Sequence, residues 1–237
     1  MPAISIVIPT LNEAAELPET LHRAMAIEGL HEIIVVDAGS TDATQAFARE
    51  KNCTILECDP SRGKQLRLGA EHATGEIILF LHADTWLPEN AGAVIADTIT
   101  KPGIIGGAFY KCFRDGGALP GSRLRCWLLW KFTNRLFGDQ AIFVKRTALE
   151  QADGVPDVPL MEEFELCKAL APHGKLALAT ATVLTSARKF REEGSFNTYW
   201  RMMRCLTRYF LGAPPQRLAS IYYEATANVR EAQDAKI

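Results

Sequence analysis

Three groups of polar residues in the first 90 positions directly follow short apolar runs, and their side chains are of kinds that bind ligands. They are Pro9-Thr10-Leu11-Asn12-Glu13, the loop that begins at Asp37, and His82-Ala83-Asp84. Glu13 and Asp37 are placed to accept hydrogen bonds from a base or a ribose. A divalent cation on phosphates needs only one or two protein carboxylates, and Asp84 is a candidate. Each acid alone is also typical of a helix cap or a turn.

The apolar runs before these groups alternate with helical patterns. Strands are predicted at residues 4–8, 33–36, 54–56 and 77–81, and helices near residues 17–25, 43–47 and 64–73. Alternating strands and helices indicate right-handed crossovers and a parallel sheet. Ligands of such sheets bind beyond the carboxyl ends of the strands. We therefore expect the three polar groups to converge on one crevice.

The pattern is less regular after residue 100. Strands of a mixed or smaller second sheet are predicted at residues 108–113 and 140–144, and helices near residues 162–170 and 198–210. No stretch rich in Pro, Gly or Ser marks a boundary, so the prediction is one domain over residues 1–237.

Composition and charge exclude several classes of protein. Of the 237 residues, 48% are hydrophobic and 23% are charged, which excludes a disordered or collagen-like chain. A formal charge of −2 gives no sign of a nucleic-acid partner. No apolar run reaches the roughly 18 residues of a membrane span, and the amino terminus has no basic segment or cleavage site of a secretory signal. We expect a cytoplasmic protein and leave open a peripheral position at the inner face of the membrane.

Common phosphate-binding and redox motifs are absent from the sequence. No G-x-G-x-x-G follows the first predicted strand, and no G-x-x-x-x-G-K-[ST] occurs. Phosphates would then be held by a metal ion and by side chains, and Lys64 in Arg62-Gly63-Lys64-Gln65 could offset diphosphate charge. The six cysteines include no C-x-x-C pair, which predicts reduced, mostly buried thiols.

Five segments, in order, resemble a family-2 glycosyltransferase with the GT-A fold: IVIPTLNE, IIVVDAGSTDAT, GEIILFLHADTWLP, GDQAIFV and PLMEEFEL. The likeness spans residues 3–215 and is greatest to a small bacterial subgroup marked by LHADT, GGAF, GDQ and TSAR, the last at residues 185–188. It implies an α/β fold with a mostly parallel central sheet flanked by helices. It also implies transfer of a sugar from a nucleotide-diphosphate donor to a hydroxyl acceptor, with inversion at the anomeric carbon and a lipid-like acceptor as one option.

The resemblance makes residues 1–100 the nucleotide-binding half. The loop after the first strand would touch the base and ribose, and Ala38 replaces the second acid of the family's Asp-Asp-Gly-Ser, which leaves UDP, GDP and dTDP open. Lys64 or Arg188 would assist the departing diphosphate. The implied donor-binding residues are Pro9, Thr10, Leu11, Glu13, Asp37, Lys64, Ala83 and Arg188.

His82-Ala83-Asp84 matches the family's Asp-x-Asp metal motif with its first acid replaced. Asp84 would bind Mg2+ or Mn2+, and His82 would either ligate through a ring nitrogen, or pack or form a hydrogen bond within the protein. Glu162-Glu163 matches the family's Glu-Asp pair, so Glu163 is implied to be the general base that takes the acceptor's proton. The alternative is a pair of acids favoured by a helix N-terminus.

Residues 101–237 become the acceptor half, with amphipathic helices near the C-terminus. Asp139 and Gln140 of the GDQ motif, together with Glu162, would bind the acceptor, although Asp139 could equally be a turn carboxylate. Gly106-Gly107 would allow either close approach to the donor sugar or backbone packing.

Two stretches combine bases with large apolar residues: RLRCWLLWKFTNR at residues 123–135 and YWRMMRCLTRYFL at residues 199–211. In the second, Arg201, Arg204 and Arg208 share one helical face. The pattern is typical of an interfacial helix on anionic lipid. A helix packed on the core or on a second subunit of a homodimer, with arginines that extend to solvent, is the alternative.

Two other functions stay open at this point. A sugar-1-phosphate nucleotidyltransferase also has an α/β sheet with a metal-bound Asp, but its first loop normally carries glycine and arginine, which PTLNE lacks. A non-catalytic nucleotide-sugar binder or scaffold would explain the departures at Ala38 and His82.

Overall fold

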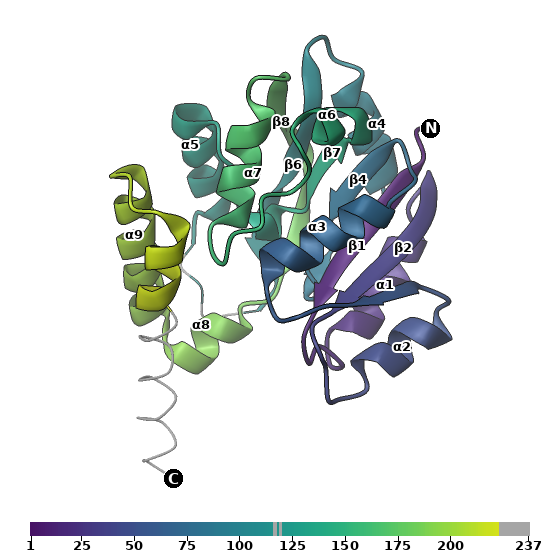
Figure 1. Cartoon of the computed structure of the whole chain (residues 1–237), viewed down its shortest axis with the longest axis horizontal. Helices are drawn as coiled ribbons and strands as arrows, with labels where there is room; N and C mark the ends of the chain where they lie inside the picture. The colour runs from purple at the N-terminus through teal and green to yellow at the C-terminus, as the bar shows by residue number, and fades with distance from the viewer. Residues whose placement is uncertain (116–117, 119, 223–237) are drawn as a thin grey trace.

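The computed structural model describes residues 1–115, 118 and 120–222. Its strands form a single eight-stranded sheet in the order β3-β2-β1-β4-β7-β6-β8-β5 (Figure 1). The first four strands pair in parallel, as predicted. They are β1 (Ile4–Thr10), β2 (Leu30–Asp37), β3 (Thr54–Glu57) and β4 (Ile77–Phe80).

The strands of the second half extend this same sheet, which corrects the expectation of a smaller second sheet. They are β5 (Thr85–Trp86), β6 (Ile104–Phe113), β7 (Ile142–Lys145) and β8 (Lys175–Thr185). β7 runs antiparallel to both β4 and β6, β8 runs parallel to β6, and β5 runs antiparallel to β8. The physical reason is that β7 pairs directly with β4 and so continues the sheet instead of starting another.

Gly106 and Gly107 allow β6 to fit between its two neighbours. A Cβ on Gly106 would lie 2.4 Å from the Phe143 carbonyl oxygen, and one on Gly107 would lie 2.3 Å from the Ala177 carbonyl oxygen. Both distances are far shorter than a normal van der Waals contact. These glycines therefore serve backbone packing, one of the two alternatives that the sequence left open.

Helices cover both faces of the sheet, and α8 and α9 lie at one end (Figure 1). One face carries α1 (Leu17–Met25), α2 (Thr44–Glu50) and α4 (Ala91–Ile99). The other carries α3 (Arg62–His72), α5 (Ser122–Thr133), α6 (Arg146–Gln151) and α7 (Glu162–Leu170). The remaining helices are the single 3-10 turn η1 (Gly138–Gln140), α8 (Arg188–Glu193) and α9 (Ser195–Phe210).

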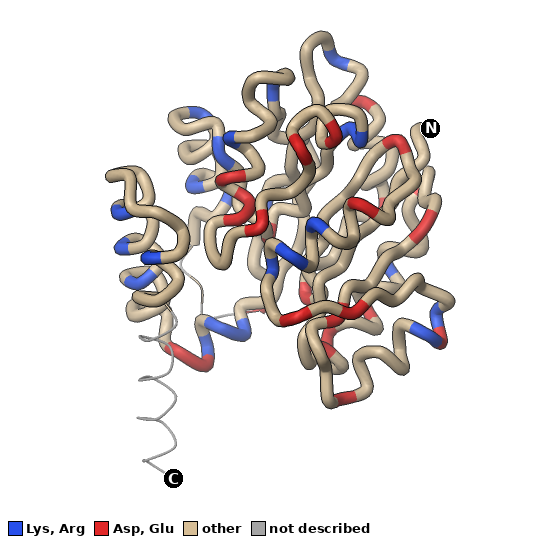
Figure 2. The backbone as a smooth tube through the Cα atoms, in the orientation of Figure 1, with Lys and Arg blue, Asp and Glu red and all other residues tan. Residues whose placement is uncertain are grey.

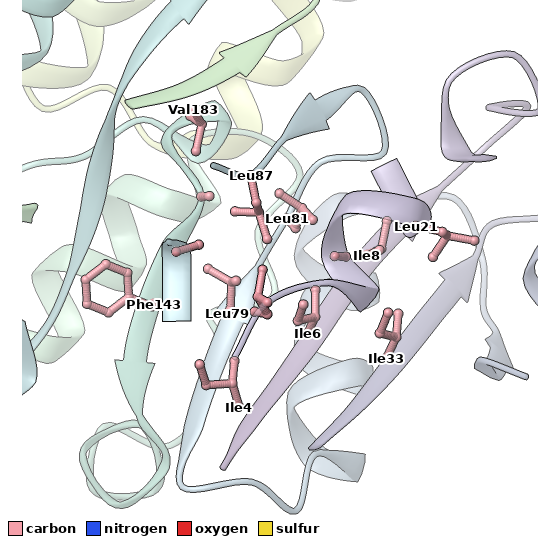
Figure 3. Close-up of a cluster of buried hydrophobic side chains, with 14 of the residues drawn as sticks. Ile4, Ile6, Ile8, Leu21, Ile33, Leu79, Leu81, Leu87, Phe143 and Val183 are labelled. Carbon is pink, nitrogen blue, oxygen red and sulfur yellow. The ribbon is translucent and has the colours of Figure 1, made fainter. Parts of the chain in front are cut away.

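Alternate side chains of the central strands enter two separate cores. Ile6 and Ile8 of β1 pack with α1 and α4, as Figure 3 shows for one core, whereas Val7 between them packs with α3. A strand covered by helices on both faces is apolar at most of its positions. This explains why residues 33–36 and 77–81 read as unbroken apolar runs, whereas Ser5 and Thr10 are buried polar exceptions in β1.

All six cysteines are free, and three of them are buried, whereas the prediction was that most would be. Burial raises the pKa of the Cys167 thiol to about 12, so this thiol stays protonated. Among the described residues, no helix is long and apolar enough to cross a membrane.

Candidate functional site

Asp37 organises the loops that follow β1 and β2. The strand register pairs Thr10 with Asp37, and the Thr10 hydroxyl donates to the Asp37 carboxylate at 2.9 Å. The same carboxylate accepts from the Ser40 hydroxyl at 2.5 Å, the Ser40 N–H at 2.8 Å, the Gly39 N–H at 3.1 Å and Gln45 Nε2 at 2.9 Å. Burial by itself would raise the pKa of Asp37, but these hydrogen bonds outweigh it and hold the pKa below its ordinary value.

Asp37 consequently has little capacity left for a ligand. A carboxylate offers about four lone-pair sites, and here five donors already occupy them. Its side chain is also fully buried, as are Pro9, Thr10 and Ala83 nearby. In this structure Asp37 positions the loop, and Leu11 of the neighbouring loop is 46% exposed.

Glu13 and Arg188 join the first loop to the end of β8. Arg188 Nη2 lies 3.1 Å and 3.0 Å from the two Glu13 carboxylate oxygens. Burial raises the pKa of Glu13, Arg188 opposes that rise, and the nearby charge of Asp84 adds to it. The sequence therefore placed Glu13, Asp84 and Arg188 correctly in one neighbourhood, although they are up to 175 residues apart in the chain.

Asp84 is held in place through its backbone while its carboxylate remains poorly compensated. Its carbonyl oxygen accepts from Arg114 Nη1 at 2.8 Å and from the Ser186 N–H at 3.2 Å. Arg114 also forms an ion pair with Glu16 and stacks on Trp86. Burial raises the pKa of Asp84 and the charge of Asp139 raises it further, and the opposing charges of Arg188 and Arg62 do not cancel the rise. A cation beside this carboxylate would relieve both effects.

His82 is engaged with a different partner. Its Nε2 lies 3.3 Å from Arg62 Nη1. Because a guanidinium can only donate, the imidazole must accept at Nε2. Burial and the positive charges of Arg62 and Lys111 hold the pKa of His82 well below its ordinary value, so the ring is neutral. This arrangement matches the hydrogen-bonded alternative for His82.

A metal site complete in itself is not present in the described part of the chain, which contains no group of three or more His, Cys, Asp and Glu side chains able to hold a metal ion. Mg2+ bound to nucleotide phosphates takes most of its ligands from phosphate and water. One undercompensated carboxylate at Asp84 therefore fits a metal that arrives with a diphosphate, and does not fit a resident metal.

Arg62 lies near both Asp84 and the Glu162-Glu163 pair. It begins α3, where a Cβ on the adjacent Gly63 would lie 2.7 Å from the Val158 carbonyl oxygen, so the start of α3 packs closely on the segment before α7. Arg62 Nε lies 3.7 Å from the buried Glu162 carboxylate. Burial raises the pKa of Glu162, and Arg62 opposes that rise.

Glu163 lies against the GDQ motif. A Cβ on Gly138 would lie only 1.9 Å from Glu163 Oε1, so the missing side chain makes room for the carboxylate. Burial raises the pKa of Glu163 to about 8, and the charges of Glu162 and Asp139 contribute in the same direction, whereas Arg62 opposes them. Such a pKa suits a proton acceptor near neutral pH.

The other two residues of the motif support this arrangement. Asp139 pairs with Lys111, whose Nζ lies 2.6 Å and 2.5 Å from its two oxygens. Gln140 is fully buried and bonds to the Phe109 carbonyl oxygen and the Phe137 N–H, both at 2.8 Å. Gln140 therefore anchors the turn, and no part of it is accessible in this structure.

Lys64, which was predicted to offset diphosphate charge, forms an ion pair at the surface. It is exposed and lies 3.8 Å from Asp59. The cation that faces the carboxylates is Arg62, two residues earlier. The sequence also gave no role to Lys111 or Arg114. The feature of the sequence that could have indicated a role for Lys111 is its charge within the otherwise apolar run AFYKCF.

Two hollows of the structure lie away from these carboxylates. One, of about 350 Å³, is between α3 and α6, and the other, of about 400 Å³, is beside the end of α9. The site is thus defined by its interacting charges: Glu13 with Asp84, Asp84 with Asp139, and Asp139 with Glu163.

The family model for "Glycosyl transferase family 2" matches residues 5–148, which is more than half of the chain. This chain belongs to glycosyl transferase family 2. The match confirms the family predicted from the sequence and disfavours the nucleotidyltransferase alternative. The matched range contains the loops of Glu13, Asp37 and Asp84 and the GDQ motif.

Several relatives carry names of glycosyltransferases, in agreement with the prediction of an enzyme. A PGL/p-HBAD biosynthesis glycosyltransferase of Mycobacterium bovis is 34% identical over 160 residues, which are 61% of this chain and 60% of the relative. An undecaprenyl-phosphate 4-deoxy-4-formamido-L-arabinose transferase of Sodalis glossinidius is 31% identical over 97 residues, 36% of this chain and 30% of the relative. The matched regions thus span at most about three fifths of these relatives.

Solved structures confirm the GT-A fold. A mannosyltransferase from Pyrobaculum calidifontis, solved with GDP-Man and Mn2+, has a TM-score of 0.67 and 20% identity over 96% of this chain and 70% of its own. TarS of S. aureus has a TM-score of 0.64 and 18% identity over 81% of this chain and 62% of its own. At this level of identity the likeness concerns the fold.

Proposed function

We propose that the protein transfers a sugar from a nucleotide-diphosphate donor to a hydroxyl acceptor, with inversion at the anomeric carbon. The observation that carries this proposal is the carboxylate of Glu163, whose pKa is raised to about 8 in a chain of this family. A carboxylate that takes a proton near neutral pH is what the attack of a hydroxyl requires.

In the proposed reaction Glu163 accepts the proton of the acceptor hydroxyl. The acceptor oxygen forms a bond to the anomeric carbon as the bond from that carbon to the diphosphate oxygen breaks, and the electron pair leaves with the nucleoside diphosphate. The positive charge of Arg62, near both Asp84 and the Glu162-Glu163 pair, is placed to stabilise the negative charge that grows on the leaving group. Arg188 is a second cation at the Glu13 side.

Asp84 is the residue that would hold Mg2+ or Mn2+ together with the donor's diphosphate. A bound divalent ion neutralises phosphate charge and so makes the diphosphate a better leaving group. The Pyrobaculum calidifontis mannosyltransferase was solved with Mn2+ and GDP-Man, which supports a similar donor class here. Asp139 and Glu162 are proposed to orient the acceptor, and the undecaprenyl-phosphate named for the Sodalis relative supports a lipid-like acceptor as one option.

The metal assignment is tested by donor binding. Thermal shifts with UDP-, GDP- and dTDP-sugars, each with and without Mn2+, identify the donor, and calorimetry then measures its affinity. Asp84→Ala is expected to abolish the part of the affinity that depends on Mn2+, whereas Asp97→Ala, an exposed aspartate on α4, is expected to leave it unchanged. Mn2+-dependent affinity retained in Asp84→Ala would contradict the assignment.

A further inference from the structure

The helix α9 turns its large apolar side chains outward. Phe196 is 79% exposed, Trp200 60%, Met203 55% and Phe210 50%. Their spacing of four, three and seven residues places them on one stripe of the helix. The opposite side, which faces the protein, buries Thr198, Arg201 and Cys205. An ordinary surface helix has the reverse arrangement, with its apolar stripe on the core.

The neighbouring helix α5 has a similar exposed set. Its exposed large apolar residues are Leu124, Trp127, Leu128 and Phe132, the last at 76% exposure. The two helices touch, because Arg125 Nη2 of α5 lies 3.1 Å from the Tyr199 hydroxyl of α9. We call the exposed apolar residues of the two helices, together with the bases beside them, the α5–α9 surface.

The charge of this surface has one sign. Neither helix contains an Asp or a Glu, although the whole chain has 28 acids against 26 Lys and Arg residues and a net charge of −2. Figure 2 shows Lys and Arg along both helices. The two helices carry six bases, Arg123, Arg125, Lys131, Arg201, Arg204 and Arg208. Arg201 faces the protein and pairs with Glu193, so the α5–α9 surface includes the other five.

We propose that the α5–α9 surface docks on an anionic lipid bilayer. Exposed Trp, Phe and Leu side chains would enter the boundary of the bilayer, and the bases beside them would meet anionic headgroups. A bilayer satisfies both features at once. A symmetric dimer through the same surface would cover the apolar residues but would bring two sets of bases together without an acid to pair them.

The surface is joined to the proposed catalytic region through α7. Phe164, the residue after Glu163, contacts Tyr209 and Phe210 of α9, with ring centroids 5.5 Å and 6.2 Å apart. An enzyme docked in this way would hold Glu163 near the bilayer. The docking itself is independent of the transfer reaction, because it needs neither donor nor acceptor.

The test is co-sedimentation of the full chain with vesicles of phosphatidylglycerol or of phosphatidylcholine, at low and high salt. We expect binding to phosphatidylglycerol at low salt, and at least about tenfold weaker binding to phosphatidylcholine or at high salt. The triple variant Phe196→Ser, Trp200→Ser, Met203→Ser is expected to lose at least about tenfold in affinity. Met25→Ser, at an exposed methionine of α1, is the apolar control and is expected to bind like the wild type.

Charge-reversed variants test the electrostatic part. Lys131→Glu with Arg204→Glu is expected to weaken binding to phosphatidylglycerol at least about tenfold, whereas Lys51→Glu with Lys101→Glu, the same change of charge elsewhere, is expected to weaken it much less. Glu163→Gln is expected to bind vesicles like the wild type, which separates docking from catalysis. Absence of vesicle binding by the wild type would overturn the proposal, as would equal binding by all variants. A lipid-free dimer that the triple variant abolishes would overturn it in favour of a subunit interface.

Discussion

Asp37 is a buried carboxylate and Glu163 is a half-buried one, and their surroundings differ in kind. Five donors surround Asp37 and hold its pKa below the ordinary value in spite of burial. Glu163 lies beside Glu162 and Asp139, and burial together with these charges raises its pKa to about 8. Both acids were predicted to be functional, but their environments favour different roles.

The comparison separates a positioning acid from a reactive one. A carboxylate with all of its lone pairs occupied stabilises the fold and cannot easily take a proton. A carboxylate with little compensation costs stability in its charged form and is ready to accept a proton. The hydrogen bonds to Asp37 thus make its loop rigid, and the proposed chemistry falls to the region of α7 and η1.

The largest expected effect is that of Glu163→Gln. Glutamine preserves the size of the side chain but cannot accept the proton, so turnover of the donor sugar, measured as transfer or as hydrolysis to water, should fall about 10²-fold or more. Donor affinity should stay near that of the wild type, and stability above pH 4.5 should not fall, because glutamine removes the cost of a poorly compensated carboxylate. Glu165→Gln on the same helix, where Glu165 accepts from the Tyr209 hydroxyl, is the matched control. Unchanged turnover in Glu163→Gln would remove Glu163 from its proposed role.

Asp37→Asn should lower the stability of the fold and should not act directly on the transfer reaction. The amide nitrogen cannot accept the hydrogen bonds now made to one carboxylate oxygen, so the free energy of unfolding in urea should fall by about 2–4 kcal/mol. Asp59→Asn, at an exposed aspartate, should change it by less than about 0.5 kcal/mol. A loss of donor affinity at unchanged stability would instead show that Asp37 contacts the donor directly.

Gly138→Ala should have the smallest of these effects and should act through Glu163. The new methyl group would occupy the place of Glu163 Oε1, so the carboxylate must rotate away, and turnover should fall about tenfold while the fold is retained. In the Glu163→Gln background the same substitution should cause no further loss. An equal loss in both backgrounds would mean that Gly138 acts on something other than this carboxylate.

The regular half of the fold was predictable because its strands are buried on both faces. Residues 33–36 read as an unbroken apolar run, and they lie within β2. The strand β8 was missed, since Lys175–Thr185 alternates small residues and threonines at one side of the sheet. The pairing of β7 with β4 was also beyond prediction, because antiparallel contact between segments some 65 residues apart leaves no local signal.

The site was predictable where it follows strand ends and unpredictable where it depends on side-chain direction. Glu13, Asp84 and Glu163 come after recognisable elements, and the structure brings their charges together. Lys64 and Arg62 are two residues apart, and the packing of Gly63 on Val158 decides that Arg62 faces the carboxylates. A single sequence contains no pattern that predicts the contact between Gly63 and Val158.

Titration of the Glu163 carboxylate tests the central claim most directly. Difference infrared or 13C-glutamate spectra of the wild type minus Glu163→Gln follow this group without any need for the substrate. A raised pKa means that the native state keeps its proton above pH 4.5, so stability from this group falls as pH rises toward 8, whereas the fraction of charged base and the value of kcat/KM increase over that range. The account predicts a transition near pH 8, and a transition near the ordinary value of 4.5 would contradict it.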